Sequence, residues 1–203
     1  MNLGSGKDYK PGWLNVDILE RAQPDLVLDL AQELTLPFMA RTQGRGRVAL
    51  DANSLDAIYA NNVLEHVPDL PRLMTNLLAL LKEEGEIELE VPYEKSMTAW
   101  QDPTHLRAMN LNSWLYYTNW FWYLGWFEHR FEMVHFQWLD IKLAPCEESQ
   151  AAFMKVKLKK ISTTHHERSV ARTMSPDFGG ITDDRQIAAA QKTRKADHPV
   201  IPS

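Results

Sequence analysis

Short apolar runs dominate the first sixty residues of the chain. They lie at residues 2–3, 13–18, 26–28 and 55–60, and a glycine, aspartate or asparagine stands near the end of each. Runs of this length are too short for helices, and their composition predicts four buried strands.

One helix and one further strand follow. Leucines recur at helical spacing from about residue 69 to residue 82, and we expect Gly85 to close this helix. Residues 87–91 then alternate between apolar and polar positions as a fifth strand, whose ladder Pro92 ends.

The composition changes in the second half of the chain. Residues 114–138 carry most of the aromatic side chains. The segments 131–141 and 152–161 both have the pattern of strands, and the polar stretch 145–150 separates them. This arrangement predicts an antiparallel hairpin.

The order of these elements indicates an α/β fold. We expect a Rossmann-like, mostly parallel sheet that ends in an antiparallel hairpin, with reduced N-terminal helices. One domain should span residues 1–162. Residues 163–203 lose the periodicity and predict an extended or flexible tail, with one helical turn at about 186–192.

Two connections near the N-terminus are unusually short. The stretches 7–12 and 19–25 leave little room for the crossover helices that join parallel strands. A parallel sheet is normally covered on both faces. We therefore expect a partner subunit, as in a homodimer, or the aromatic segment 114–138 to cover the bare face.

Composition and charge narrow the class of protein. Apolar residues make up 44% and charged residues 24% of the 203 residues, and the net charge is −5. No stripe of positive residues offers a footprint for nucleic acid, so we expect none as a partner. The single cysteine, Cys146, and the absence of a leader pattern at the N-terminus favour a cytoplasmic protein.

A stretch of uncharged residues, 108–127, approaches the length of a membrane span. Its asparagines and aromatic side chains argue against spanning. Three interpretations of the aromatic segment stay open: a lid and ligand pocket, plain core or dimer interface, and contact with a membrane surface.

A glycine turn and an aspartate suggest a nucleoside ligand. Gly4-Ser5-Gly6 follows the first strand, where the backbone can approach a ligand closely, and Asp17 ends the second strand, where its carboxylate can bind both ribose hydroxyls. A dinucleotide fits poorly, because its fingerprint would need a third glycine at Tyr9 and a helix where Pro11 stands.

At these positions the sequence resembles the class I S-adenosylmethionine-dependent methyltransferase family, of the small methyltransferase-11-like type. The resemblance covers about residues 2–92. It is carried by the segments 2–6, 12–17, 29–38 and 62–67. It implies S-adenosylmethionine as the cofactor, with the glycine turn at its methionine portion, Asp17 at the ribose and Asp29 at the adenine. The cofactor-binding residues that it implies are Gly4, Ser5, Gly6, Asp17, Ile18, Asp29, Leu30, Asn61 and Asn62.

Candidates for activating the methyl acceptor lie downstream, in a possible lid or acceptor region at 96–138. His105 is our first candidate for a general base, because an imidazole can take a proton from a hydroxyl at neutral pH, and Asp102 could orient the ring. His66 is a weaker candidate. The alternatives stay open that these residues are structural caps, or that proximity alone suffices.

The acceptor itself is expected by analogy to be a small molecule or a glycan precursor, methylated at oxygen. A catalytically silent nucleoside-binding or partner subunit of the same fold is the alternative. Cys146 is interpreted as structural. The pair His165-His166 has no further ligand residue nearby, so no metal is expected.

Overall fold

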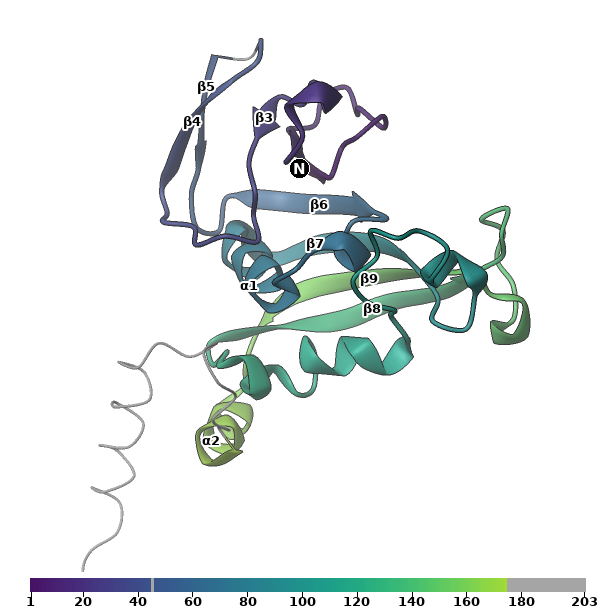
Figure 1. Cartoon of the computed structure of the whole chain (residues 1–203). Helices are drawn as coiled ribbons and strands as arrows, with labels where there is room; N and C mark the ends of the chain where they lie inside the picture. The colour runs from purple at the N-terminus through teal and green to yellow at the C-terminus, as the bar shows by residue number, and fades with distance from the viewer. Residues whose placement is uncertain (45, 175–203) are drawn as a thin grey trace, which may run out of the picture.

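The computed structural model of the chain describes residues 1–44 and 46–174, and a sheet of seven strands forms its centre (Figure 1). The first five strands in the order below pair in parallel, and the last two add an antiparallel hairpin. This confirms the predicted fold class. The order is β3 (Leu26–Val27), β2 (Asn15–Asp17), β1 (Asn2–Leu3), β6 (Leu55–Asn61), β7 (Leu81–Pro92), β9 (Phe153–Ser162) and β8 (His129–Leu139).

The predicted helix is α1 (Leu70–Leu80), and Asp69 caps it by accepting a hydrogen bond from the Arg72 N–H at 2.9 Å. The expectation that Gly85 closes α1 is wrong, because the chain passes from Leu80 directly into β7. Gly85 lies inside β7 instead, where a side chain would lie 2.9 Å from the Lys82 carbonyl oxygen.

A buried polar network replaces the missing crossover helix between β1 and β2. The Asn2 amide donates to Oδ1 of Asn15 at 2.8 Å, and the Asn15 N–H donates to Oδ2 of Asp25 at 2.8 Å. The Tyr9 hydroxyl donates to the other oxygen of Asp25. These bonds satisfy the polar groups of the short connection between β1 and β2. The connection between β2 and β3 contains the single turn η1 (Glu20–Ala22).

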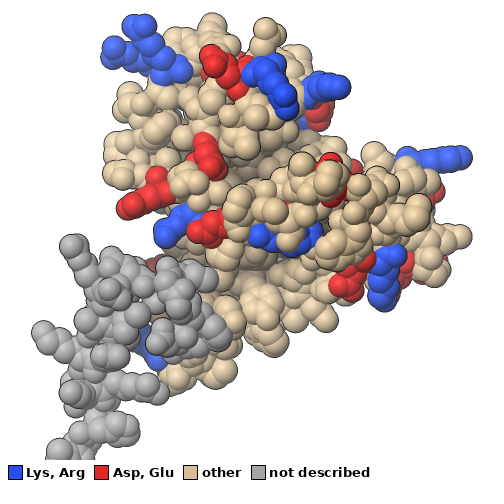
Figure 2. Space-filling model, viewed as in Figure 1, with Lys and Arg blue, Asp and Glu red and all other residues tan. Residues whose placement is uncertain are grey.

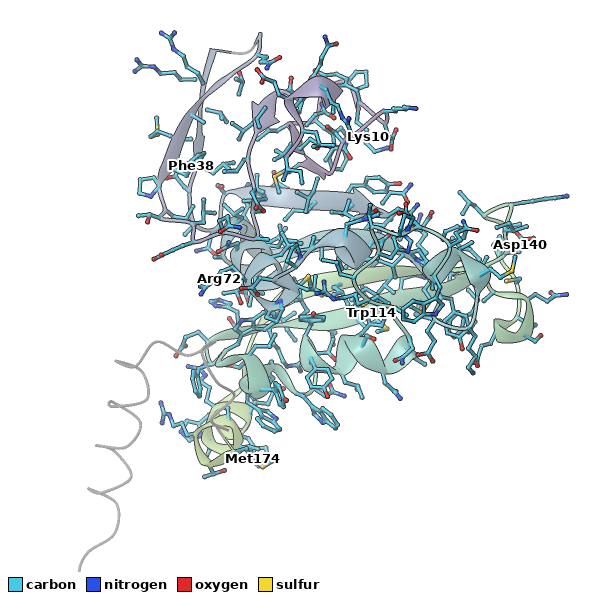
Figure 3. The ribbon with its side chains drawn as sticks, in the orientation of Figure 1. Lys10, Phe38, Arg72, Trp114, Asp140 and Met174 are labelled. Carbon is cyan, nitrogen blue, oxygen red and sulfur yellow. The ribbon has the colours of Figure 1, made fainter. Side chains whose placement is uncertain are left out.

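The two faces of the sheet differ. α1 and the aromatic segment lie over the same apolar face, where the Trp126 indole N–H donates to the Thr75 hydroxyl of α1. Trp114, labelled in Figure 3, lies on the turn η4 (Leu111–Tyr116). Its side chain and that of Phe121, on the turn η5 (Phe121–Leu124), are buried in that core. The core interpretation therefore holds for these side chains. The surface over η4 and η5 is uncharged (Figure 2).

The opposite face carries a ladder of ion pairs between β7 and β9. Lys155 pairs with Glu88 at 2.6 Å, and Lys157 pairs with Glu86 at 3.3 Å. Of the two covers expected for the bare face, the aromatic segment does not lie on this side, and a partner subunit stays a prediction. Alternating lysines and glutamates let the face meet water without a covering helix.

Three elements depart further from the sequence analysis. The hairpin of β4 (Phe38–Thr42) and β5 (Gly46–Leu50) was not predicted, and it stands apart from the large sheet (Figure 1). Residues 165–174, interpreted as part of an extended tail, form the helix α2 (His165–Met174). The turn expected at 186–192 lies outside the described residues. Among the described residues, no helix has the length and apolarity needed to cross a membrane.

Candidate functional site

The glycine turn after β1 is shaped by a close approach to Val63. Gly4 and Gly6 both have positive φ, at 63° and 44°. A side chain on Gly4 would lie 2.3 Å from a methyl carbon of Val63, so only glycine fits there. Between them, the hydroxyl of Ser5 is buried and has no hydrogen-bond partner among the described residues. The turn therefore holds an unpaired polar group, and at Gly6 the nearest atom to a side chain would be 3.7 Å away.

Asp17, at the end of β2, is tied directly to this turn. Its Oδ2 accepts a hydrogen bond from the Gly6 N–H, and its Oδ1 accepts one from the Leu19 N–H, both at 2.8 Å. The carboxylate is thus held in one orientation. Each of its oxygens can accept a further hydrogen bond, which is what binding a pair of ribose hydroxyls requires.

The remaining predicted cofactor residues have different surroundings. The Asp29 carboxylate accepts the Ala31 N–H at 2.8 Å and is exposed. The Ile18 side chain is 64% exposed, whereas that of Leu30 is packed in the core, so Leu30 could offer a ligand its backbone alone.

Asn61 and Asn62 lie at the end of β6. The Asn62 side-chain amide donates to Oδ1 of Asn61 at 2.9 Å, and Asn62 has a positive φ of 50°. Since β3, β2, β1 and β6 are neighbouring parallel strands, the residues that follow them gather at one edge of the sheet. A ligand of an open α/β sheet binds at this edge.

A second group of polar side chains joins the turn η2 (Leu64–His66), just beyond β6, to the loop after η3 (Met97–Ala99). It consists of Glu65, His66, Asp102, Thr104 and His105. Nε2 of His105 lies 4.0 Å from Oε1 of Glu65 and 4.0 Å from Oδ2 of Asp102. The two imidazole rings meet edge to face, with centroids 4.7 Å apart.

Hydrogen bonds indicate which nitrogen of each ring carries a proton. Nδ1 of His105 lies 2.9 Å from the Ala99 carbonyl oxygen, which can only accept, so Nδ1 is protonated and the lone pair of the neutral ring is on Nε2. The Thr104 hydroxyl donates to Asp102 at 2.7 Å and can therefore accept from Nδ1 of His66 at 3.0 Å.

Asp102 was expected to orient the ring of His105, but in the structure it is linked to the ring of His66. Its bonded partner is Thr104, which in turn holds His66, while the backbone carbonyl of Ala99 orients His105. The distance of 4.0 Å between Asp102 and His105 is too long for a hydrogen bond.

Backbone contacts fix the two segments against each other. The Leu106 N–H donates to the Glu65 carbonyl oxygen at 2.8 Å. The guanidinium of Arg107 donates to the carbonyl oxygens of Leu64, Val67 and Pro68, around the end of η2. Arg107 therefore anchors the turn that carries Glu65 and His66.

Glu65 and Thr104 are the two residues of this group that the sequence analysis did not select, and Glu65 is the buried one. It is 1% exposed, and neither carboxylate oxygen has a hydrogen-bond partner among the described residues. Burial raises the pKa of its carboxyl group to about 7, while its own backbone N–H and, to a smaller extent, the positive form of His105 oppose this rise. The signal in the sequence was an acidic residue inside an otherwise apolar run, next to His66.

Glu65, His66 and His105 also offer three ligand atoms within 4.8 Å of one another. Two ligands at about 2.1 Å from one ion lie no more than about 4.2 Å apart. We assign no metal to the group.

An open cavity of about 470 Å³ lies beyond the end of β7, and none of the predicted site residues lines it. Its walls include Tyr93 and Lys95, which both bond to Glu148 of the turn η6 (Glu148–Gln150). Cys146, interpreted as structural, is partly buried in the same connection.

A family model described as a methyltransferase domain matches residues 13–139. The chain is similar to part of the complex between the Haloferax volcanii Trm112 methyltransferase activator and a protein described as a methyltransferase, with 15% identity over 81% of this chain and 82% of that one, at a TM-score of 0.53.

It is also similar to an S-adenosylmethionine-dependent methyltransferase from Clostridium acetobutylicum, with 10% identity over 78% of this chain and 82% of that one, at a TM-score of 0.50. A search of the curated proteins found no match. At these identities the likeness to solved structures concerns the fold, while the family model covers well over half of the chain.

Proposed function

The chain belongs to the class I S-adenosylmethionine-dependent methyltransferase family, and from that premise we propose that it methylates an oxygen of a small molecule or glycan precursor. The domain that does so would span residues 1–162. The observation that carries the proposal is a free imidazole lone pair, on Nε2 of His105, in a loop that is bonded to the turn after β6. A base of this kind can take the proton of a hydroxyl acceptor as the oxygen is methylated.

The residues at the cofactor end of the site fit S-adenosylmethionine. The unpaired Ser5 hydroxyl, the space beside Gly6 and the fixed Asp17 carboxylate together suit a polar ligand with a ribose and no phosphate. Gly4, Ser5 and Gly6 would hold its methionine portion, with Asp17 and Ile18 at the ribose. Asp29 and Leu30 would lie at the adenine, and Asn61 and Asn62 beside them. When bound, the cofactor supplies a methyl group on a positively charged sulfur.

The chain's own residues would then prepare the acceptor. His105 accepts the proton of the acceptor hydroxyl at Nε2, and the electron pair stays on the oxygen, which becomes the nucleophile. The exposed Asp102 side chain marks the side from which the acceptor enters. His66, held through Thr104, contacts the His105 ring and limits its movement.

Product formation tests this proposal. The protein is incubated with S-adenosylmethionine and a panel of sugar nucleotides, phenols and small alcohols, and release of S-adenosylhomocysteine is measured. We expect release with at least one hydroxyl acceptor. Replacing His105 by Gln should lower kcat by about 10²-fold while affinity for S-adenosylhomocysteine is kept. The matched control is His129→Gln, on β8, where an imidazole faces Glu83.

The alternative is a catalytically silent subunit that binds the cofactor and associates through its uncharged surface. It predicts binding of S-adenosylhomocysteine without turnover for any acceptor. Equal turnover by the wild type and by His105→Gln would remove His105 from the reaction but leave methyl transfer standing.

A further inference from the structure

Glu65 presents a buried acidic group that the proposed reaction does not yet use. A carboxylate without hydrogen bonds inside a protein is unfavourable, so an unpartnered one calls for an explanation in its surroundings. The titratable side chains that act on its charge are those of His105, Asp102 and Glu90.

The position of His105 supplies that explanation. Its Nε2 lies between two carboxylates, each 4.0 Å away: Glu65 on the interior side, 2% exposed in its side chain, and Asp102 on the solvent side, 44% exposed. Nδ1 is held by the Ala99 carbonyl oxygen, so the ring cannot turn its lone pair elsewhere without losing that bond. A proton arriving at Nε2 therefore appears next to Glu65.

We propose that Glu65 is a positioning residue for His105, whose carboxylate stabilises the imidazolium ion that forms when His105 accepts the acceptor's proton. The inference rests on the proposed role of His105. In the step, the O–H bond of the acceptor breaks, an N–H bond forms at Nε2, and the positive charge on the ring is balanced by the negative charge on Glu65.

The charge of Glu65 acts strongly on the His105 ring, whereas the charge of Asp102 acts weakly. Glu65 is enclosed in the protein, where opposite charges about 4 Å apart are poorly screened, whereas Asp102 faces water. The bonds from Leu106 and Arg107 fix the turn that carries Glu65 against the loop of His105. The distance between the two groups is thus set by the fold.

The coupling can be measured without cofactor or acceptor. The protein is labelled with ¹³C at the glutamate carboxyl carbon, the Glu65 signal is identified by its absence in Glu65→Gln, and its chemical shift is followed from pH 4 to pH 9. A coupled pair titrates in two steps that belong to both groups. We expect such a two-step curve for the wild type.

Two variants should move the Glu65 midpoint in opposite directions. His105→Gln removes a positive charge that favours the carboxylate, and should raise the midpoint by about 1 pH unit. Asp102→Asn removes a negative charge that disfavours it, and should lower the midpoint by a smaller amount. The control His129→Gln should leave it unchanged.

A single-step wild-type curve, or a midpoint in His105→Gln equal to that of the wild type, would overturn the inference. The wild-type curve decides the matter even where a variant does not fold. The titration needs no turnover. A protein that shows the coupling but transfers no methyl group would therefore contradict the proposed function, while the inference that Glu65 and His105 are coupled would still hold.

Discussion

The backbone N–H of Gly6 donates directly to the carboxylate of Asp17, at 2.8 Å, so the turn after the first strand and the acid at the end of the second form one unit. The eleven-residue step between them is closed by this bond without an intervening helix. The spacing that argued against a dinucleotide in the sequence corresponds to a short, hydrogen-bonded connection in the structure.

Asp17→Ala should weaken binding of S-adenosylhomocysteine by about 1.5–3 kcal/mol, because it removes the proposed hydrogen bonds to the ribose. It also leaves the N–H groups of Gly6 and Leu19 without their acceptor. Isothermal titration calorimetry measures the affinity, and circular dichroism checks that the variant is folded. Unchanged affinity in a folded variant would remove Asp17 from the site.

Gly4→Ala should lower the free energy of unfolding by about 2 kcal/mol or more, because it adds a contact with Val63 to an unfavourable positive φ. The matched control is Gly12→Ala, which has the same kind of φ and nothing within 4 Å, and should lose only about 1 kcal/mol. Urea unfolding gives both values.

Adding Val63→Ala to Gly4→Ala should recover part of the loss, since it removes the two methyl carbons that the new side chain meets. Equal losses for Gly4→Ala and Gly12→Ala would show that the close approach to Val63 has no energetic weight.

Lys160→Met should destabilise the fold by about 2–4 kcal/mol, because it leaves buried carbonyl groups unpaired. The Lys160 ammonium donates to the carbonyl oxygens of Leu78 and Leu81 and to the Asn53 side chain, at 2.7–2.8 Å, around the end of α1. Lys157→Met, on the charged face of the same strand, should change stability by no more than about 1 kcal/mol. A small effect at both positions in thermal unfolding would contradict this role of Lys160.

Glu65→Gln should make the protein more stable at pH 8 and have little effect near pH 4. The pKa of the Glu65 carboxyl is raised by burial from 4.5 to about 7 in the folded protein, so the folded state keeps the proton longer than the unfolded state. Deprotonation of Glu65 therefore lowers the free energy of unfolding as pH rises from about 4.5 to about 7. Over this range the loss reaches up to about 3 kcal/mol.

A glutamine cannot lose that proton, so the stability gap between Glu65→Gln and the wild type should open over the same pH range. Unfolding in urea at pH 4.5, 6 and 8 measures it. A gap that does not change with pH would mean that Glu65 is ionised in the same way in the folded and unfolded chains.

The local pattern of apolar and polar residues was sufficient to predict most strands of the large sheet. The alternation in 152–161 gave a strand, but the second lysine of Lys159-Lys160 points into the core, where the end of α1 supplies carbonyl acceptors. That acceptor set lies about eighty residues away, so no local pattern could reveal it. The hairpin of β4 and β5 was missed because apolar and polar residues do not alternate clearly in its sequence, and its inward positions are mostly only half-buried.

The candidate site was predicted in part for the same reason. Gly6 and Asp17 belong to short motifs whose spacing carries information. The bond between Thr104 and His66 joins residues thirty-eight positions apart, and the choice of Ala99 as the partner of His105 depends on the path of a loop. Glu65 was visible as an acid in an apolar run, but its lack of a partner is a property of the folded protein.

The account is tested most directly by calorimetric titration of the wild-type protein with S-adenosylhomocysteine and, separately, with NAD. A glycine turn fixed to Asp17 without a pyrophosphate-binding helix predicts one site per chain for S-adenosylhomocysteine and no measurable binding of NAD. Binding of NAD in the absence of binding of S-adenosylhomocysteine would contradict the assignment of this edge of the sheet.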